Sequence, residues 1–204
     1  MRDKDTGTLR VREITAKVSE GSDCSQKEAT AYLKELLRLV ARGLQDEAFC
    51  EDAAAALYAL SFCDVKEEKQ IDLIGGLGDL HKAHGKNGRI AEHFAVVCFN
   101  YNVTPGATQT VAAYNVTNLR GLEAAFPEST EIVECCSGAL RAFHARSDSA
   151  RYQKSVEELE ALAERHPDNA VVMDDLAFAR AHLKTLPESN NLFKKYYDWT
   201  KDRA

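Results

Sequence analysis

Residues 150–183 read ARYQKSVEELEALAERHPDNAVVMDDLAFARAHL, and this stretch decides the fold. Apolar residues recur at intervals of three and four on both sides of the Pro-Asp-Asn turn at 167–169. Before the turn they are Val156, Leu159, Leu162 and Ala163, and after it they are Val172, Leu176 and Ala179. This spacing places each set on one face of an α-helix, because a helix turns once in about 3.6 residues. The stretch is therefore predicted to be two antiparallel helices joined by a short turn.

The same pattern recurs along the chain with a period of about 41 residues. Turn segments begin at Lys86, Pro127 and Pro167, spaced 41 and 40 residues apart, and one further step back reaches Gln45-Asp46. Each turn is followed by three apolar residues at i, i+4 and i+7. The four triplets are Cys50, Ala54, Leu57; Ala91, Ala95, Cys98; Ile132, Cys136, Ala139; and Val172, Leu176, Ala179. Each triplet predicts the buried face of one helix.

A second apolar stripe precedes each turn, and no run alternates convincingly with a period of two, so we expect an all-α chain. The predicted repeat helices lie at about 26–44, 48–62, 66–84, 89–102, 107–126, 130–145, 151–166 and 169–184. We interpret 1–204 as a single helical-repeat domain, with an N-terminal cap segment at 1–25, repeat helices at 26–184 and a C-terminal cap at 185–204. Helices at about 8–19 and 189–202 are expected within the caps. The latter carries Phe193, Tyr196, Tyr197 and Trp199, which either pack onto the last pair or allow self-association.

Residues 150–183 resemble the second helix of a tetratricopeptide repeat, its closing proline and the first helix of the next repeat. Tyr152, Leu159 and Ala163 stand where that motif has an aromatic and apolar residues, and Pro167 stands where it ends. The family period is about 34, shorter than the one found here, and HEAT-like helical pairs are the nearest competitor. The resemblance implies an α-solenoid of about four antiparallel helix pairs in a right-handed superhelix. It also implies protein or peptide binding on a concave face, without enzymatic activity.

In such a superhelix the first helix of each pair lines the concave side, so recurring positions away from the triplets on these helices are candidates for binding. Two columns result. The first holds Asp52, His93, Glu134 and Asp174, and the second holds Asn100 and Arg141. Ala56, Val97 and Gly138 lie between the columns, with Phe178 as the exception in the last pair, and the small residues predict a groove that an extended peptide could enter. The carboxylates favour a basic partner, and the alternative is an ordinary solvated helix face.

Composition and motifs exclude several classes of protein. No apolar stretch is long enough to cross a membrane, and the charged first residues, MRDKDTGTLR, are unlike an export signal. We therefore expect a cytoplasmic location and reduced cysteines. The net charge of -6 argues against broad nucleic-acid binding. No catalytic motif is complete, so no enzymatic activity, cofactor or metal is expected.

Three smaller signals have structural explanations that we favour. His81 and His84 are three residues apart, so their side chains could bind one zinc ion together with the nearby His93. The sequence has no HExxH motif, however, and roles at helix ends fit these histidines better. Cys135 and Cys136 are adjacent in a predicted helix and point about 100° apart, so they do not pair with each other. Cys135 is expected to be partly exposed, with a redox role as the alternative to a packing role. Glycines 75, 76 and 78 predict close helix packing or a kink.

The sequence thus favours a non-enzymatic interaction module, acting as an adaptor, a chaperone-like protein or a scaffold. It would bind a protein or peptide segment in the predicted groove. A regulatory or sensory repeat domain that binds a small molecule or short peptide is the alternative. A helical metal- or thiol-dependent enzyme is a third, weaker hypothesis.

Overall fold

The computed structural model describes residues 2–19, 24–63, 65–145 and 149–185, and every regular element in these ranges is an α-helix. This confirms the all-α prediction for the described residues. The helices are α1 (Arg2–Ser19), α2 (Gln26–Gly43), α3 (Glu47–Leu60), α4 (Glu67–Ala83), α5 (Gly88–Val103), α6 (Gln109–Ala125), α7 (Thr130–Ala145), α8 (Ser149–Arg165) and α9 (Ala170–Thr185). The first helix begins at Arg2, earlier than predicted. The helix predicted at 189–202 and its aromatic cluster lie outside the described residues.

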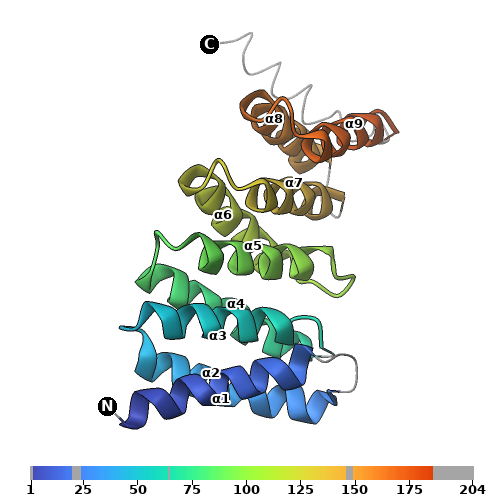
Figure 1. Ribbon diagram of the computed structural model, residues 1–204. Helices are drawn as coiled ribbons and strands as arrows, with labels where there is room; N and C mark the ends of the chain where they lie inside the picture. Colours follow the sequence, from blue (N-terminus) through green and yellow to red (C-terminus); the bar gives the residue numbers. More distant parts are fainter. Residues whose placement is uncertain (1, 20–23, 64, 146–148, 186–204) are drawn as a thin grey trace, which may run out of the picture.

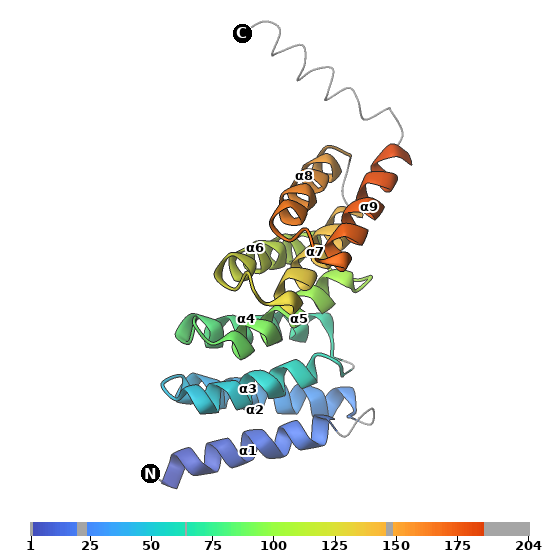
Figure 2. The ribbon, with the colours of Figure 1, turned by 45° about the horizontal axis from the view of Figure 1, so that its top comes forward.

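The odd-numbered helices lie one above another, and the even-numbered helices lie behind them (Figure 1). Helix α3 contacts α1 and α5, and α7 contacts α5 and α9, so the odd-numbered helices form a continuous layer. Each even-numbered helix packs against the odd-numbered helices that precede and follow it in the chain. Figure 2 shows that α8 and α9 run at a steep angle to α1 and α3, because the stack turns along its length.

Three turns of the chain share one hydrogen-bond pattern, at spacings close to the period seen in the sequence. In each turn, the residue that follows the helix donates its backbone N–H to the carbonyl oxygen four residues earlier. Its own carbonyl oxygen accepts a hydrogen bond from the backbone N–H three residues later. The residues that follow the helices are His84, Phe126 and His166, and those three positions later are Asn87, Ser129 and Asn169. His84 and Phe126 also have nearly equal backbone angles, with φ of -129° and -132°.

Side-chain caps explain where the odd-numbered helices begin. The side-chain oxygens of Asp46, Asn87 and Asn169 each accept a hydrogen bond of 3.1 Å from the backbone N–H three residues later. Ser129 does the same for α7 at 3.4 Å. Each bond satisfies one of the backbone donors that the first turn of a helix leaves free. These four caps recur with the turns, so the local sequence fixes where α3, α5, α7 and α9 start.

The predicted apolar triplets form much of the core, and all twelve of their residues are at most 4% exposed. One of the predicted glycines permits close packing in the core. A Cβ atom on Gly76 would lie 2.6 Å from Leu37 Cδ2 and 3.3 Å from Leu57 Cδ1. By contrast, a Cβ on Gly75 would meet nothing within 4 Å, and one on Gly78 would make an ordinary contact with Phe94. The close-packing prediction therefore holds for Gly76 alone.

Buried polar side chains also join the helices. Asn115 of α6 donates a 3.1 Å hydrogen bond to Asn102 Oδ1 of α5, and Asn102 donates to the carbonyl of Ala112. Both asparagines are fully buried, so these bonds fix the register of α5 against α6. No helix in the described ranges combines the length and apolar character that a membrane crossing requires.

Candidate functional site

Most side chains of the first predicted column already have partners within the chain. Asp52 of α3 accepts a 2.8 Å hydrogen bond from Arg12 Nε of α1. Glu134 of α7 accepts a 3.5 Å bond from Asn169 Nδ2. His93 of α5 stacks on Tyr58, with ring centroids 4.7 Å apart. Asp174 of α9 is exposed and forms no ion pair within the described residues. The column is therefore not a continuous free ladder of carboxylates.

Three capping side chains, including the partner of Glu134, also bind carboxylates of the preceding odd-numbered helix. Asn87, which caps α5, also donates to Glu47 and Glu51 of α3 at 2.8 and 2.7 Å. Ser129, which caps α7, donates to Glu92 of α5 at 2.9 Å. Asn169 caps α9 and donates to Glu134 in the same way. Each cap thus ties one odd-numbered helix to a carboxylate of the preceding one.

The two residues of the second column have different surroundings. Asn100 is half-buried and lines a small cavity of about 30 Å³ with Gln70 and Tyr101. Arg141 Nη1 lies 2.7 Å from Asp175 Oδ1, and its guanidinium lies 5.4 Å from the ring centre of Phe178. Asp175 is 3% exposed and accepts a 2.8 Å hydrogen bond from Ser137 Oγ. Arg141 therefore neutralises a buried carboxylate.

The small residues between the columns do not line an open groove, which corrects the sequence expectation. Ala56, Val97 and Gly138 are all buried. A Cβ atom on Gly138 would lie 2.6 Å from the ring of Phe99, so the neighbouring helix occupies this space. Small side chains here allow α3, α5 and α7 to approach one another closely.

An aromatic patch, formed by Tyr58, Phe62 and His93, lies where α3 meets α5. The rings of Tyr58 and Phe62 meet edge to face with centroids 5.0 Å apart, and Tyr58 stacks on His93 at 28°. Phe62 is 63% exposed, whereas the other two rings are half-buried. The patch therefore presents one open ring, Phe62, that packs against Tyr58, which is itself stacked on His93.

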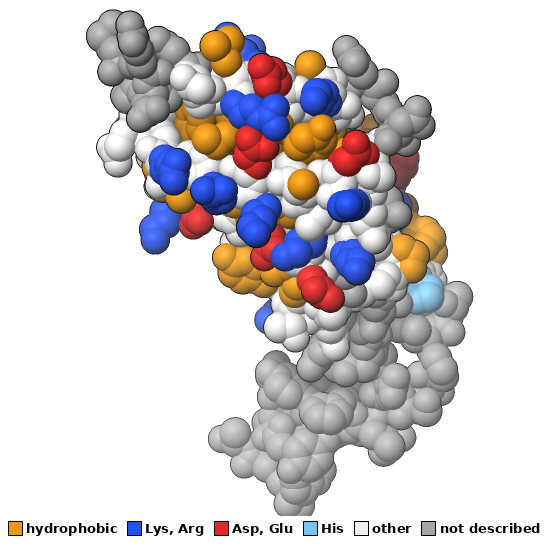
Figure 3. All heavy atoms as spheres, turned by 90° about the horizontal axis from the view of Figure 1, so that it is seen from below, with side chains coloured by type: hydrophobic (Ala, Val, Ile, Leu, Met, Phe, Trp, Pro, Cys, Tyr) orange, Lys and Arg blue, Asp and Glu red, His pale blue; other side chains and the backbone are white. Residues whose placement is uncertain are grey.

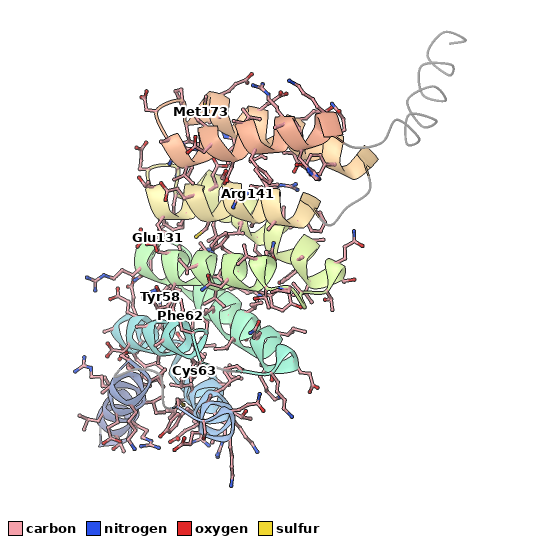
Figure 4. All side chains as sticks on the ribbon, turned by 90° about the vertical axis from the view of Figure 1, so that its right-hand side faces the viewer. Tyr58, Phe62, Cys63, Glu131, Arg141 and Met173 are labelled. Atoms are coloured by element: carbon pink, nitrogen blue, oxygen red, sulfur yellow. The ribbon has the colours of Figure 1, made fainter. Side chains whose placement is uncertain are left out.

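The patch borders an acidic position on α7. Burial raises the pKa of Tyr58, and the negative charge of Glu131 raises it further. Burial lowers the pKa of His93, which makes its imidazole neutral at pH 7. Figure 4 shows Glu131 above Tyr58 and Phe62 on the same side of the stack, with Met173 of α9 further along. Glu131 is exposed and forms no ion pair in the described part of the chain. The geometry can therefore receive a cationic or aromatic group.

The sequence prediction included His93 but missed Tyr58, Phe62 and Glu131. One signal was available, because Tyr58 and Phe62 are four residues apart near the end of a predicted helix and so share a face. Their stacking on His93 could not be read from the sequence, since it depends on how α3 packs against α5.

The other histidines of the zinc hypothesis have separate contacts. His84 Nε2 lies 2.8 Å from the carbonyl oxygen of Leu44, and His81 lies between the rings of Phe94 and Phe126. Within the described residues, no three His, Cys, Asp or Glu side chains are arranged to hold a metal ion.

The adjacent cysteines are core residues of α7. Cys135 is 7% exposed rather than partly exposed as expected, because α5 covers its side of α7. Burial raises the pKa of Cys135 and of Cys136 to about 12 each, so both thiols are protonated at neutral pH. Another pair of cysteines lies close together. The Cys24 thiol, before α2, adds to the effect of burial, and together they raise the pKa of Cys63, after α3, to about 11.

Comparison with protein-family models, curated proteins and solved structures finds no match for this chain.

Proposed function

We propose that the chain is a tetratricopeptide-like α-solenoid that acts as a non-enzymatic interaction module. It binds a basic peptide segment of a partner protein across α3, α5 and α7. The aromatic patch beside Glu131 is the observation that carries this proposal. The recurring turns at His84, Phe126 and His166 support the repeat architecture, because one turn geometry returns at about one period.

The patch has the chemistry that recognises a lysine or arginine side chain. A cation placed over an aromatic ring is attracted by the electron density of its face, and Arg stacks on such rings especially well. Phe62 offers an open ring, and Glu131 supplies the opposite charge nearby. Met173, which is 45% exposed on α9, adds an adaptable apolar contact further along the same side. An aromatic ring, a carboxylate and an apolar side chain together suit a segment that mixes basic and apolar residues.

The test uses a panel of synthetic peptides and three single variants. The panel holds Arg- and Lys-containing sequences and matched versions in which Gln replaces each basic residue, with affinity measured by fluorescence anisotropy. We expect Phe62→Ala and Glu131→Lys to weaken binding of the best basic peptide roughly tenfold each, since one interfacial anchor contributes 1 kcal/mol or more. Glu164→Lys is the matched control, because Glu164 is exposed on α8 in the other layer.

The proposal fails if the Gln versions bind as well as the basic peptides, or if Glu131→Lys and Glu164→Lys weaken binding equally. Circular dichroism of each variant must match that of the wild type. Both acidic residues are exposed, so neither change should disturb packing.

A cavity gives the small-molecule alternative a specific basis. It has a volume of about 560 Å³ and lies between the first half of α1 and the end of α2. Its lining includes Leu39, Phe49 and Arg42, together with Arg10 and its ion-pair partner Glu35, so it offers apolar walls with charged groups. A thermal-shift screen tests this alternative, since a ligand of the native state raises its stability. A ligand of the cavity should lose its effect in Leu39→Trp, which fills the cavity, and should keep it in Phe62→Ala.

A further inference from the structure

The outward surface of α2 carries a basic row, which consists of Lys27, Lys34, Arg38 and Arg42. All four residues are exposed, and their spacings of seven, four and four residues place them along one side of the helix. The buried residues of α2, Ala29, Leu33, Leu36 and Val40, lie on the opposite side. The row spans about 22 Å, at a rise of about 1.5 Å per residue. Figure 3 shows the basic side chains at the end of the stack that α1 and α2 form.

The two carboxylates of α2 are hydrogen-bonded to groups outside the row, although the charge of Glu35 also acts on Arg38. Glu28 accepts hydrogen bonds from the backbone and hydroxyl of Ser25 in a capping box, which lower its pKa. Glu35 accepts two bonds from Arg10 of α1, at 2.8 and 3.0 Å, and these lower its pKa. Within the described residues, no ion pair involves any of the four basic residues. The row therefore presents positive charge to solvent, although the whole chain carries a net charge of -6.

We propose that the basic row binds an acidic protein segment, in particular a helix that bears Asp or Glu one turn apart. Lys34, Arg38 and Arg42 follow one another at one-turn intervals, which matches the spacing of such carboxylates on a partner helix. Small exposed side chains at Ala31 and Ala41 lie beside the row and let a partner helix approach closely. A short acidic segment suits this site better than an extended polyanion. A nucleic acid or an anionic membrane would also meet the net negative charge of the rest of the chain.

The test measures binding of a synthetic helical peptide with Glu at every i, i+4 position to the full chain. A peptide of the same length with Gln at those positions, a single-stranded oligonucleotide and anionic lipid vesicles are the comparison ligands. The test variant is the double substitution Lys34→Glu with Arg38→Glu. The control is Lys82→Glu with Lys154→Glu, which makes the same change in net charge on α4 and α8, where both residues are exposed.

We expect the test variant to lose roughly tenfold or more in affinity for the Glu peptide, because two attractions become repulsions. The logarithm of the affinity for the Glu peptide should fall less than half as much in the control as in the test variant. The affinity of the wild type for this peptide should fall with added salt. Equal losses in both variants would overturn the proposal, as would equal affinity for the Gln peptide. Tighter binding of the oligonucleotide or the vesicles, abolished in the test variant, would overturn it in favour of that ligand. Lys34 and Arg38 are not part of the aromatic patch, so failure of this proposal would leave the proposed function untouched.

Discussion

Arg141 was predicted to bind a partner, and the structure gives it a second task that can be measured. Its guanidinium lies 2.7 Å from the buried carboxylate of Asp175. Arg141→Met removes the charge and keeps an apolar stem to pack near Phe178. We predict that this substitution lowers the free energy of unfolding by about 2 kcal/mol.

The magnitude follows from the burial of the two groups. Removing one partner of a fully buried ion pair costs about 3–5 kcal/mol, because the remaining charge stays desolvated. The Asp175 side chain is 5% exposed but that of Arg141 is 42% exposed, so water replaces part of the lost contact. The hydrogen bond from Ser137 also remains.

Urea unfolding followed by circular dichroism measures the effect, and a double-mutant cycle isolates it. Asp175→Asn is the second single variant, and the combined variant completes the cycle. We expect a coupling free energy of about 1–2 kcal/mol, because the asparagine no longer needs the guanidinium. A coupling within about 0.5 kcal/mol of zero would refute the reasoning. Arg141 would then be available for partner binding, as the sequence predicted.

Three further predictions concern stability and redox state. Gly75→Ala should raise the free energy of unfolding by about 0.5–1 kcal/mol, because helix propensity improves in open space, whereas Gly76→Ala should lower it through overpacking. Thermal melts of both variants check this, and equal shifts would contradict it. Burial raises the pKa of Glu123, but hydrogen bonds with Arg165 and His166 outweigh burial and lower this pKa overall. The Glu123 carboxylate should therefore stabilise the fold fully above the ordinary Glu pKa and lose this effect as falling pH protonates it. In Glu123→Gln, the free energy of unfolding should depend less on pH in the acidic range. Diamide, which oxidises thiols, should join Cys24 to Cys63 in a disulfide and raise stability by up to about 4 kcal/mol, as expected for a loop of some 40 residues. A mass loss of two hydrogens assigned to that pair by peptide mapping is the readout, and its absence would contradict the closeness of the two thiols.

The helices and much of the core could be predicted because both depend on local sequence. The triplet Ile132, Cys136 and Ala139 marks a buried face by spacing alone, and burial follows once helices stack. Asn169 is a good helix cap by residue type, and its side chain does cap α9. The starts of the capped helices α3, α5, α7 and α9 were therefore predicted closely, because capping chemistry acts within three or four residues.

The binding surface could not be predicted to the same degree, because it depends on contacts between distant residues. Glu134 had the right position and charge for a binding column, yet Asn169, 35 residues away, donates to it. Gly138 suggested an open groove, but Phe99 of the neighbouring helix fills that space. A small residue predicts close approach of some other group, and the sequence does not show whether that group is a ligand or another helix.

The shared use of the capping residues determines which acidic residues remain for a ligand. Asn87, Ser129 and Asn169 each satisfy helix N–H groups and bind a carboxylate of the preceding odd-numbered helix. Carboxylates held in this way stabilise the stack, and a partner that took them would have to break those bonds. Glu131 and Asp174 are outside this set and are exposed. Charge reversal at Glu131 should therefore reduce affinity with little effect on stability, whereas reversal at Glu134 should reduce both.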